Sequence, residues 1–203
     1  MKTHPALGLI EFADIAVGMQ ATDAMLKKAP IGFVRAGTIT AGRYLTLIGG
    51  TPASVGEAVR EGLSWGGESV VDHVLLADVH PRLFEGILGR RRTDGVGSLG
   101  IVETETVAAN VRAAEAALKG TQVELVEIRP GEQGLHGKGL SVFRGELHDV
   151  EAARAFAVAV LEESGRTATT RIVSSPHEAT TAQLAEGTSF ATATLAPLPG
   201  EDG

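Results

Sequence analysis

Cysteine is absent from all 203 residues of the sequence. Its absence excludes disulfides, thiolate zinc sites, cysteine-ligated iron–sulfur clusters and a cysteine nucleophile. Aromatic residues are also scarce, at 4%, so the core must be built mainly from Ala, Val, Leu and Ile. Side chains of this size let helices and sheets approach closely, which favours thin, tightly packed layers.

Positive charge is limited as well. The chain has 18 Lys and Arg against 25 Asp and Glu, for a net charge of −7. Without a basic stripe, no nucleic-acid partner is expected. The one basic run, Arg90–Arg92, precedes a Gly-rich stretch and is interpreted as part of a solvated linker.

Long apolar runs are missing too. The first twenty residues, MKTHPALGLIEFADIAVGMQ, carry acidic residues early and resemble neither a signal peptide nor a spanning helix. The sequence therefore predicts a protein of the cytoplasm with no membrane partner.

An internal repeat is the strongest positive feature of the chain. LGLIE at 7–11 returns as LGIVE at 99–103, an offset of 92 residues. LTLIGGT at 45–51 returns as LSVFRGE at 140–146, an offset of 95. The second copy therefore has about three extra loop residues, within or near Arg129–Gln133.

Each copy has the hydrophobic pattern of a strand, a helix, two strands, a helix and a strand. This β-α-β-β-α-β order is the ferredoxin-like pattern, so the predicted fold class is α/β (α+β) with two tandem domains. In the first copy we expect strands at 7–11, 31–36, 43–49 and 70–77, and helices at 15–28 and 52–64. In the second we expect strands at 99–103, 123–128, 138–144 and 169–174, and helices at 107–119 and 147–163.

Domain boundaries follow from the repeat and from local composition. The first domain is predicted at 5–88 and the second at 98–185. Between them, 89–97 has the Gly-rich composition of a linker. Residues 186–203 lack periodicity and are predicted to be a loose tail.

The Gly-rich loop GLHGKGLS at 134–141 corresponds to TITAGR at 38–43 in the first copy. It is not a P-loop, because Lys138 is followed by Gly139 and residue 132 is Glu rather than Gly. The loop also joins strand to strand, so no helix N-terminus faces it. A G-x-G-x-x-G fingerprint is absent from it too.

Histidine offers no recognisable metal site. The helical i,i+4 spacing and the H-E-x-x-H motif are both missing. His80 and His177 adjoin prolines at matching ends of the two copies, which predicts a role in turns and packing. The histidines are His4, His73, His80, His136, His148 and His177.

Catalytic groups are equally hard to find. Ser64, Ser141 and Ser174 lie in no nucleophile elbow. Glu11 and Glu103 occupy matching strand ends, where an interface hydrogen bond or salt bridge is favoured over a paired acid–base role. No catalytic residue and no metal ligand is assigned, and an enzyme is not expected.

Four sets of paired segments carry a family resemblance. They are ALGLIEF with SLGIVET, ATDAMLKKAP with AAEAALKGTQ, TAGRYLTLIGG with HGKGLSVFRGE, and VLLADVHP with RIVSSPHEA. In this order, over residues 6–185, the chain resembles tandem-domain bacterial microcompartment shell proteins, particularly those of propanediol-utilising compartments.

The resemblance implies a homotrimer in which three chains resemble six single domains. The result is a flat pseudohexagonal tile of a shell facet, with a central pore for small-molecule metabolites. Other shell proteins and encapsulated enzymes are the implied partners, and no cofactor is required.

The resemblance also implies site residues. Lys27 and Lys119 match the lysine used at tile edges. A related tandem protein has a cysteine at the position of Thr40 that holds an iron–sulfur cluster, which threonine cannot ligate. Three copies of His136 near an axis leave a metal or anion site open. The implied pore-lining residues are Thr40, Ala41, Gly42, Leu135, His136 and Gly137.

One rival interpretation stays open. A ferredoxin-like trimeric regulator could bind a nucleotide or another small molecule in the cleft between subunits. An enzyme with a site at a subunit interface is a weaker third interpretation. The missing phosphate-loop signature and the modest basic content favour the tile.

Overall fold

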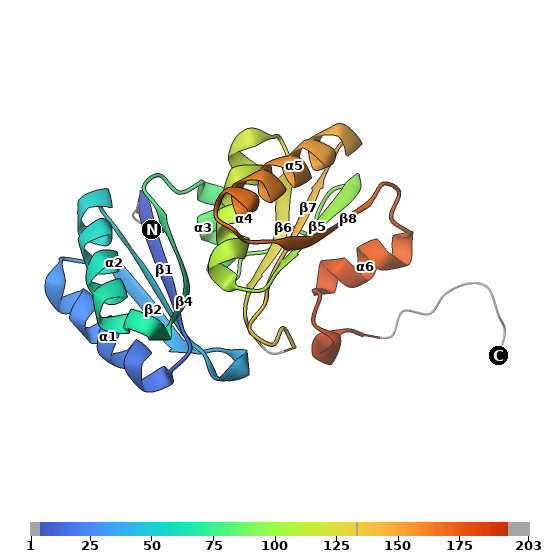
Figure 1. Ribbon diagram of the computed structural model, residues 1–203. Coiled ribbons are helices and arrows are strands. Elements are labelled where there is room, and N and C mark those ends of the chain that lie inside the picture. The colour runs from blue at the N-terminus through green and yellow to red at the C-terminus, as the bar shows by residue number, and fades with distance from the viewer. Residues whose placement is uncertain (1–4, 133, 195–203) are drawn as a thin grey trace.

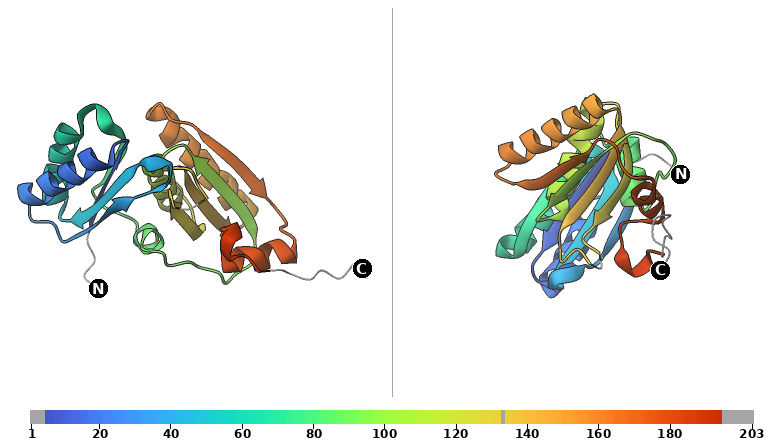
Figure 2. Two further views of the ribbon diagram at one scale, coloured as in Figure 1. Left: turned by 90° about the horizontal axis from the view of Figure 1, so that it is seen from below. Right: turned by 90° about the vertical axis from the view of Figure 1, so that its right-hand side faces the viewer.

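The computed structural model describes residues 5–132 and 134–194. Two four-stranded antiparallel sheets stand side by side, each with two long helices on one face (Figure 1, Figure 2). His4, Gln133 and residues 195–203 of the predicted tail lie outside the described residues.

The two repeats have the same order of elements, and their sheets have equivalent strand orders, β2-β3-β1-β4 and β6-β7-β5-β8. The predicted β-α-β-β-α-β order in duplicate is therefore confirmed, and the ends of these strands and helices lie within two residues of the predicted ends. The first repeat comprises β1 (Ala6–Phe12), α1 (Ile15–Lys28), β2 (Phe33–Thr38), β3 (Tyr44–Gly50), α2 (Pro52–Gly66), β4 (Val70–Leu76) and then α3 (Pro81–Ile87). The second comprises β5 (Ser98–Thr104), α4 (Val107–Gly120), β6 (Glu124–Pro130), β7 (Gly139–Gly145), α5 (Leu147–Glu163), β8 (Ala168–Val173) and then α6 (Glu178–Glu186).

Strand β1 is buried along its whole length. Side chains alternate between the two faces of a strand, and here both faces are covered. Ile10 and Phe12 pack toward α1 and α2, whereas Leu7 and Leu9 join a core on the opposite face. The same alternation places Glu11 on the side of Leu7 and Leu9, which is the side covered by the second repeat.

Helix α4 lies between the two sheets and joins the repeats. Its residues Val107, Val111 and Leu118 belong to one hydrophobic cluster with Leu9 and Val74 of the first sheet. The helix therefore packs on its own sheet and on the first repeat at the same time (Figure 1).

Two short helices, α3 and α6, were not expected from the sequence, which indicated only turns. Histidine begins both of them. The Nδ1 atom of His80 accepts a hydrogen bond from the Arg82 N–H at 3.2 Å, and that of His177 accepts from the Ala179 N–H at 3.1 Å. The predicted role of these two histidines in turns is confirmed, and its physical form is an N-cap.

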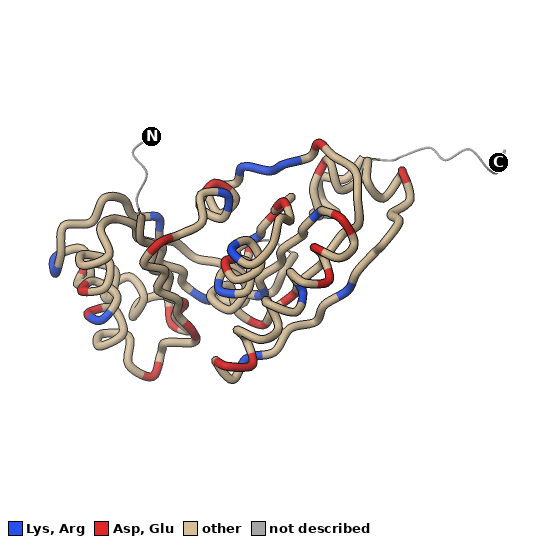
Figure 3. The backbone as a smooth tube through the Cα atoms, turned by 90° about the horizontal axis from the view of Figure 1, so that it is seen from above, with Lys and Arg blue, Asp and Glu red and all other residues tan. Residues whose placement is uncertain are grey.

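The segment 89–97 contains neither helix nor strand, and its three arginines form a continuous basic stretch in Figure 3. Arg91 does not fit the solvated interpretation, because its side chain is only 25% exposed. Its Nε lies 3.1 Å from Glu127, and its guanidinium donates to the carbonyl oxygens of Leu184 and Ala185 at the end of α6. Arg91 thus fastens α6 to the second sheet.

The first part of the predicted tail also makes contacts. The N–H of Thr188 donates to Glu127 at 3.2 Å, and Arg129 donates to the Thr188 hydroxyl at 3.2 Å. Thr194 donates its N–H and its hydroxyl to Glu186. Within the described part of the chain, no helix is both long and apolar enough to cross a membrane.

Candidate functional site

The two glycine loops join the second and third strands of their repeats. The first spans five residues, 39–43, and the second eight, 131–138. The second loop is therefore three residues longer, as the change of offset predicts. A short 3₁₀ turn, η1 (Thr40–Gly42), forms the tip of the first loop.

Both loops contain two consecutive residues with positive φ. These are Ala41 and Gly42, at 65° and 70°, and His136 and Gly137, at 49° and 82°. Glycine adopts this left-handed conformation without steric penalty, whereas alanine and histidine adopt it less readily. The shared torsions place Ala41 and His136 at equivalent positions, and likewise Gly42 and Gly137.

Thr40 joins the two loops. Its hydroxyl accepts a hydrogen bond from the Gly137 N–H at 2.9 Å and donates to the Gly131 carbonyl at 2.8 Å. Its own N–H donates to the same carbonyl at 3.1 Å. The structure therefore brings the two predicted pore loops together within one chain. The sequence predicted Thr40 as a pore-lining residue in place of cysteine but gave no indication of these hydrogen bonds.

Basic residues follow the tip of each loop. Arg43 Nη1 lies 3.4 Å from the Gly137 carbonyl and 3.5 Å from Glu11. Lys138, its counterpart, places Nζ 2.6 Å from Glu103. This hydrogen bond, with the charge of Glu103, raises the pKa of Lys138 above its ordinary value. The matched acids Glu11 and Glu103 thus form ion pairs with the loop cations, as expected from their strand positions.

The interface that α4 forms with the first sheet joins the two repeats of one chain and is called the internal joint. Glu11 lies in this interface and is fully buried. Its Oε1 accepts a hydrogen bond from the Ala108 N–H at 2.7 Å, at the N-terminus of α4. Burial is the main cause that raises the pKa of Glu11, to about 7. The Ala108 N–H and Arg43 lower the pKa, and the neighbouring Asp72 raises it.

A second buried contact fixes the start of α4. Thr106, its N-cap residue, donates its hydroxyl to Asp72 of β4 at 2.5 Å and accepts from the Ala109 N–H at 3.2 Å. Farther along the helix, Glu115 accepts from the His80 N–H at 3.0 Å. These contacts determine the register of α4 on the first sheet.

The two predicted edge lysines have different surroundings. Lys27 is exposed and pairs with Asp23 on the same helix. Lys119 is half-exposed, lies 2.8 Å from Glu115 and donates to the Asp78 carbonyl of the first repeat. Lys119 therefore contributes to the joint within the chain, while Lys27 faces solvent.

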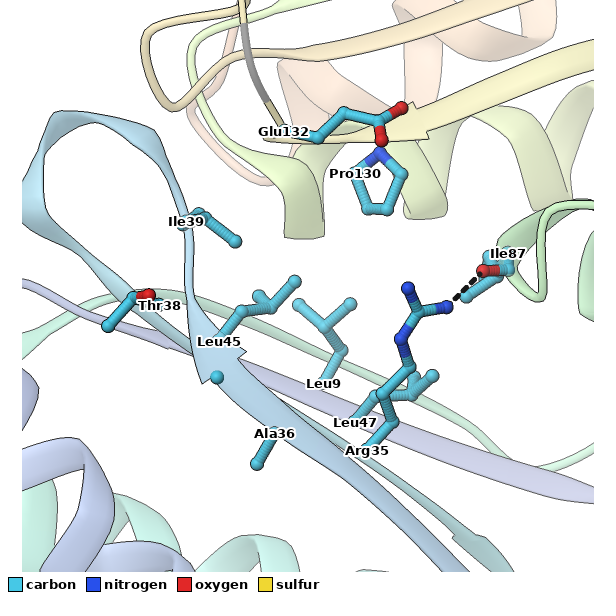
Figure 4. Close-up of a pocket in the computed structure, with 11 residues that line it drawn as sticks. Leu9, Arg35, Ala36, Thr38, Ile39, Leu45, Leu47, Ile87, Pro130 and Glu132 are labelled. Carbon is cyan, nitrogen blue, oxygen red and sulfur yellow. Dashed lines mark hydrogen bonds between the residues drawn. The ribbon is translucent and has the colours of Figure 1, made fainter.

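A cavity of about 300 Å³ lies between the first sheet and the end of β6. In Figure 4, the apolar side chains of Leu9, Leu45 and Leu47 face Pro130 across it, and Arg35 reaches the Ile87 carbonyl. Across residues 5–132 and 134–194, no three His, Asp or Glu side chains are grouped closely enough to hold a metal ion.

The equivalent face of the second sheet carries a cavity of about 370 Å³. Ile101, Leu140 and Val142 occupy the positions of Leu9, Leu45 and Leu47 there, by strand pairing. The two repeats thus have similar apolar side chains at equivalent places, and in the second repeat α6 and the segment after it, with Leu184 and Phe190, also line the cavity.

Comparison with known proteins assigns both repeats to one family. Residues 6–80 and 98–176, well over half of the chain, each match the family model described as BMC domain. The chain belongs to the BMC-domain family. Its two BMC domains correspond to the two repeats of the fold.

Related proteins agree with this assignment. The bacterial microcompartment shell protein PduT of Citrobacter freundii is 35% identical over 182 residues, 90% of this chain and 98% of PduT. A crystal structure of a microcompartments protein from Desulfitobacterium hafniense DCB is 34% identical, with a TM-score of 0.75, over 87% of this chain and 98% of that chain. These relatives favour the shell interpretation over the regulator.

The fused permuted hexameric shell protein MSM0275 from the RMM microcompartment is a more distant neighbour. It is 21% identical, with a TM-score of 0.58, over 80% of this chain and 87% of that chain. This likeness shows that the BMC-domain fold is shared.

Proposed function

We propose that this BMC-domain protein is a structural, non-enzymatic component of a bacterial microcompartment shell, acting as a trimeric tile with a central pore. Its relatives are microcompartment shell proteins, so assembly with other shell proteins follows from the family. The shell domains are assigned to residues 5–88 and 98–185, with 89–97 as linker and 186–203 as tail.

The observation that carries the proposal is a difference between equivalent helices. Val107, Val111 and Leu118 of α4 are at most 5% exposed, because the first sheet covers them. Their counterparts on α1 are Ile15, Met19 and Leu26, with exposures of 38%, 58% and 41%. The spacing of these positions places them on one helix face. This face of α1 is therefore exposed, whereas the corresponding face of α4 is covered by the first sheet.

The matching surface exists on the second repeat. In the first sheet, Leu9 and Val74 contact α4; in the second, strand pairing puts Ile101 and Arg171 at those positions. A second chain that docks its α1 there forms, between two molecules, the same contact that α4 makes within one molecule. This contact between chains is called the external joint. Because the contact is heterologous, successive copies repeat it head to tail, and the proposed tile is the ring in which three chains close it. Alternating internal and external joints give six domains from three chains.

The pore belongs to the same arrangement. Thr40 ties the two glycine loops of a chain together. A ring of three chains therefore brings three such pairs around its axis. Thr40, Ala41, Gly42, Leu135, His136 and Gly137 are the proposed pore-lining residues.

The edge of the tile is proposed to use Lys27 and, more weakly, Lys119. Lys27 is exposed and pairs only with a residue of its own helix among the contacts of the described chain. Lys119 is already engaged in the internal joint. Encapsulated enzymes remain proposed partners, and small metabolites the proposed cargo of the pore.

Light scattering of the purified protein tests the proposal. A trimer of the 21.0 kDa chain has a mass of about 63 kDa. Electron microscopy of the same fraction is expected to show sheets or tubes. Met19→Glu should abolish the trimer, since it puts a charge in the external joint. Val96→Glu, at a residue 94% exposed in the linker, is the matched control. A monomeric wild type without arrays contradicts the proposal.

A further inference from the structure

The internal joint pairs a hydroxyl on the helix with a carboxylate on the strand. Thr106, before α4, donates to Asp72 of β4 at 2.5 Å, and both side chains are buried. Next to them, Glu11 accepts the Ala108 N–H. The pair and the acceptor together hold the first turn of the helix against two strands.

The residues that correspond to this pair are Asp14 in the first repeat and Thr169 in the second, and they carry the two groups in exchanged positions. The offset of 92 places Asp14 before α1 where Thr106 precedes α4. Strand pairing places Thr169 beside Glu103, as Asp72 lies beside Glu11. The carboxylate is now on the helix and the hydroxyl on the strand.

Neither exchanged residue uses its side chain within the described part of the chain. Asp14 forms the N-cap of α1 but makes no side-chain capping bond. Thr169 is exposed on β8, an edge strand of the second sheet. An exposed acid and an exposed hydroxyl therefore stand at the two places that the internal joint pairs.

We infer that Asp14 of one copy and Thr169 of the next form the reciprocal hydrogen bond of the external joint. The Thr169 hydroxyl donates to the Asp14 carboxylate, and Glu103 accepts the N–H of Ala16, the counterpart of Ala108. The inference rests on the trimer proposed above and adds the register and polar contacts of its joint.

Charge on the two surfaces supports a second copy as the occupant. The exposed face of α1 carries Asp14 and Asp23 before its first lysine. The receiving strand carries Arg171, two residues from Thr169, where the internal joint has the apolar Val74. An acid at 169 would instead lie beside Asp14 and Glu103, and the exchange avoids that repulsion.

Disulfide trapping tests the contact, because the chain has no cysteine of its own. The double variant Asp14→Cys with Thr169→Cys is oxidised and run on a non-reducing gel. Covalent trimers are expected to the extent that the internal reference pair described next closes, because both pairs are inferred to have the same geometry. Asp14→Cys with Thr170→Cys, whose second position faces the other side of β8, is the matched control and should stay monomeric on the gel.

The internal pair supplies the reference for geometry. Asp72→Cys with Thr106→Cys should form a disulfide within one chain. If that pair closes and wild type is trimeric, but the 14/169 pair gives no covalent trimer, the inference is overturned and the tile stands. If wild type is monomeric, the tile itself fails.

Exchanging the side chains of residues 14 and 169 tests whether they form the inferred hydrogen bond. Thr169→Asp alone should weaken the trimer tenfold or more in a dilution series, because it places three carboxylates together. Adding Asp14→Thr should return the midpoint to within about threefold of wild type, since the internal arrangement is then recreated. A double variant as weak as the two single variants combined would overturn the hydrogen bond.

Discussion

Helices α1 and α4 are copies of one element with different neighbours. Helix α4 is covered on two sides and is rich in alanine, with Ala108, Ala113 and Ala117 all buried. Helix α1 is covered on one side, so that Met19 is exposed whereas Met25 is buried. The comparison shows that burial of a helix face depends on the neighbouring domain as much as on the helix's own sheet.

The largest expected effect comes from the same substitution at equivalent positions of the two helices. Val111→Glu buries a charge without a partner in the internal joint and should reduce the free energy of unfolding by about 4 kcal/mol or prevent folding. Met19→Glu should leave the unfolding free energy of the dilute chain within about 0.5 kcal/mol. Denaturant unfolding at low protein concentration measures both. Equal destabilisation by the two variants would refute the distinction between internal and external joints.

The second effect is a pH dependence of the free energy of unfolding, which Glu11 of the first repeat should cause. The pKa of Glu11 is raised from 4.5 to about 7, so the folded chain binds more protons than the unfolded chain between these values. Stability contributed by the protonated acid is therefore complete below about pH 4.5 and lost as pH rises through about 7.

Glu11→Gln keeps an oxygen for the Ala108 N–H and removes the ionisation. The variant should exceed wild type in unfolding free energy by on the order of 3 kcal/mol at pH 8, and by little at pH 4.5. Unfolding curves at several pH values give the comparison. The half-exposed counterpart, Glu103→Gln, is the control and should not show that difference; a gain at pH 8 as large as that of Glu11→Gln would refute the assignment to burial.

Equivalent substitutions in the two glycine loops should also lower the free energy of unfolding by different amounts. Thr40→Ala removes a hydroxyl that accepts one hydrogen bond and donates another between the loops, with an expected loss of about 1–2 kcal/mol. Thr40→Ser keeps the hydroxyl and should lose less. Leu135→Ala, at the position that the repeat aligns with Thr40, is the comparison. Thermal unfolding and amide exchange at Gly137 measure the effect; unchanged exchange in Thr40→Ala would contradict the hydrogen bond between Thr40 and the Gly137 N–H.

The smallest effect concerns the two histidine caps. His80→Ala and His177→Ala should each lower the unfolding free energy by about 1 kcal/mol or less, and Asn at either position should restore part of it. His80 is expected to matter more, because α3 packs beside the internal joint, whereas α6 lies at the outer side of the second sheet. A larger loss from His177→Ala would reverse that order.

The regular elements could be predicted because the hydrophobic periods of 2 and 3.6 recur with a fixed offset. The helices α3 and α6 escaped prediction, since they have seven and nine residues and begin with histidine, which is rarely read as a cap. Arg91 escaped it for another reason. A run of arginines is usually solvated, and only the folded chain places Glu127 and the end of α6 beside it.

The candidate site was predictable in position but not in contacts. Glycine and the repeat located both loops and the difference in their lengths. The partners of the Thr40 hydroxyl lie 91 and 97 residues away in sequence, so no local pattern points to them. The burial that raises the pKa of Glu11 likewise involves α4, an element of the other repeat. The pore-lining and edge assignments are still predictions.

The joint made by α4 has a consequence for how assembly depends on protein concentration. Because both halves of that joint belong to one polypeptide, it closes at a concentration set by the linker and is unaffected by dilution. At equilibrium, the amount of a ring of six separate domains depends on the sixth power of the free domain concentration, whereas the amount of the proposed ring of three chains depends on the third power of the free chain concentration. In the proposed tile, fusion therefore makes ring formation less sensitive to a low concentration of chains.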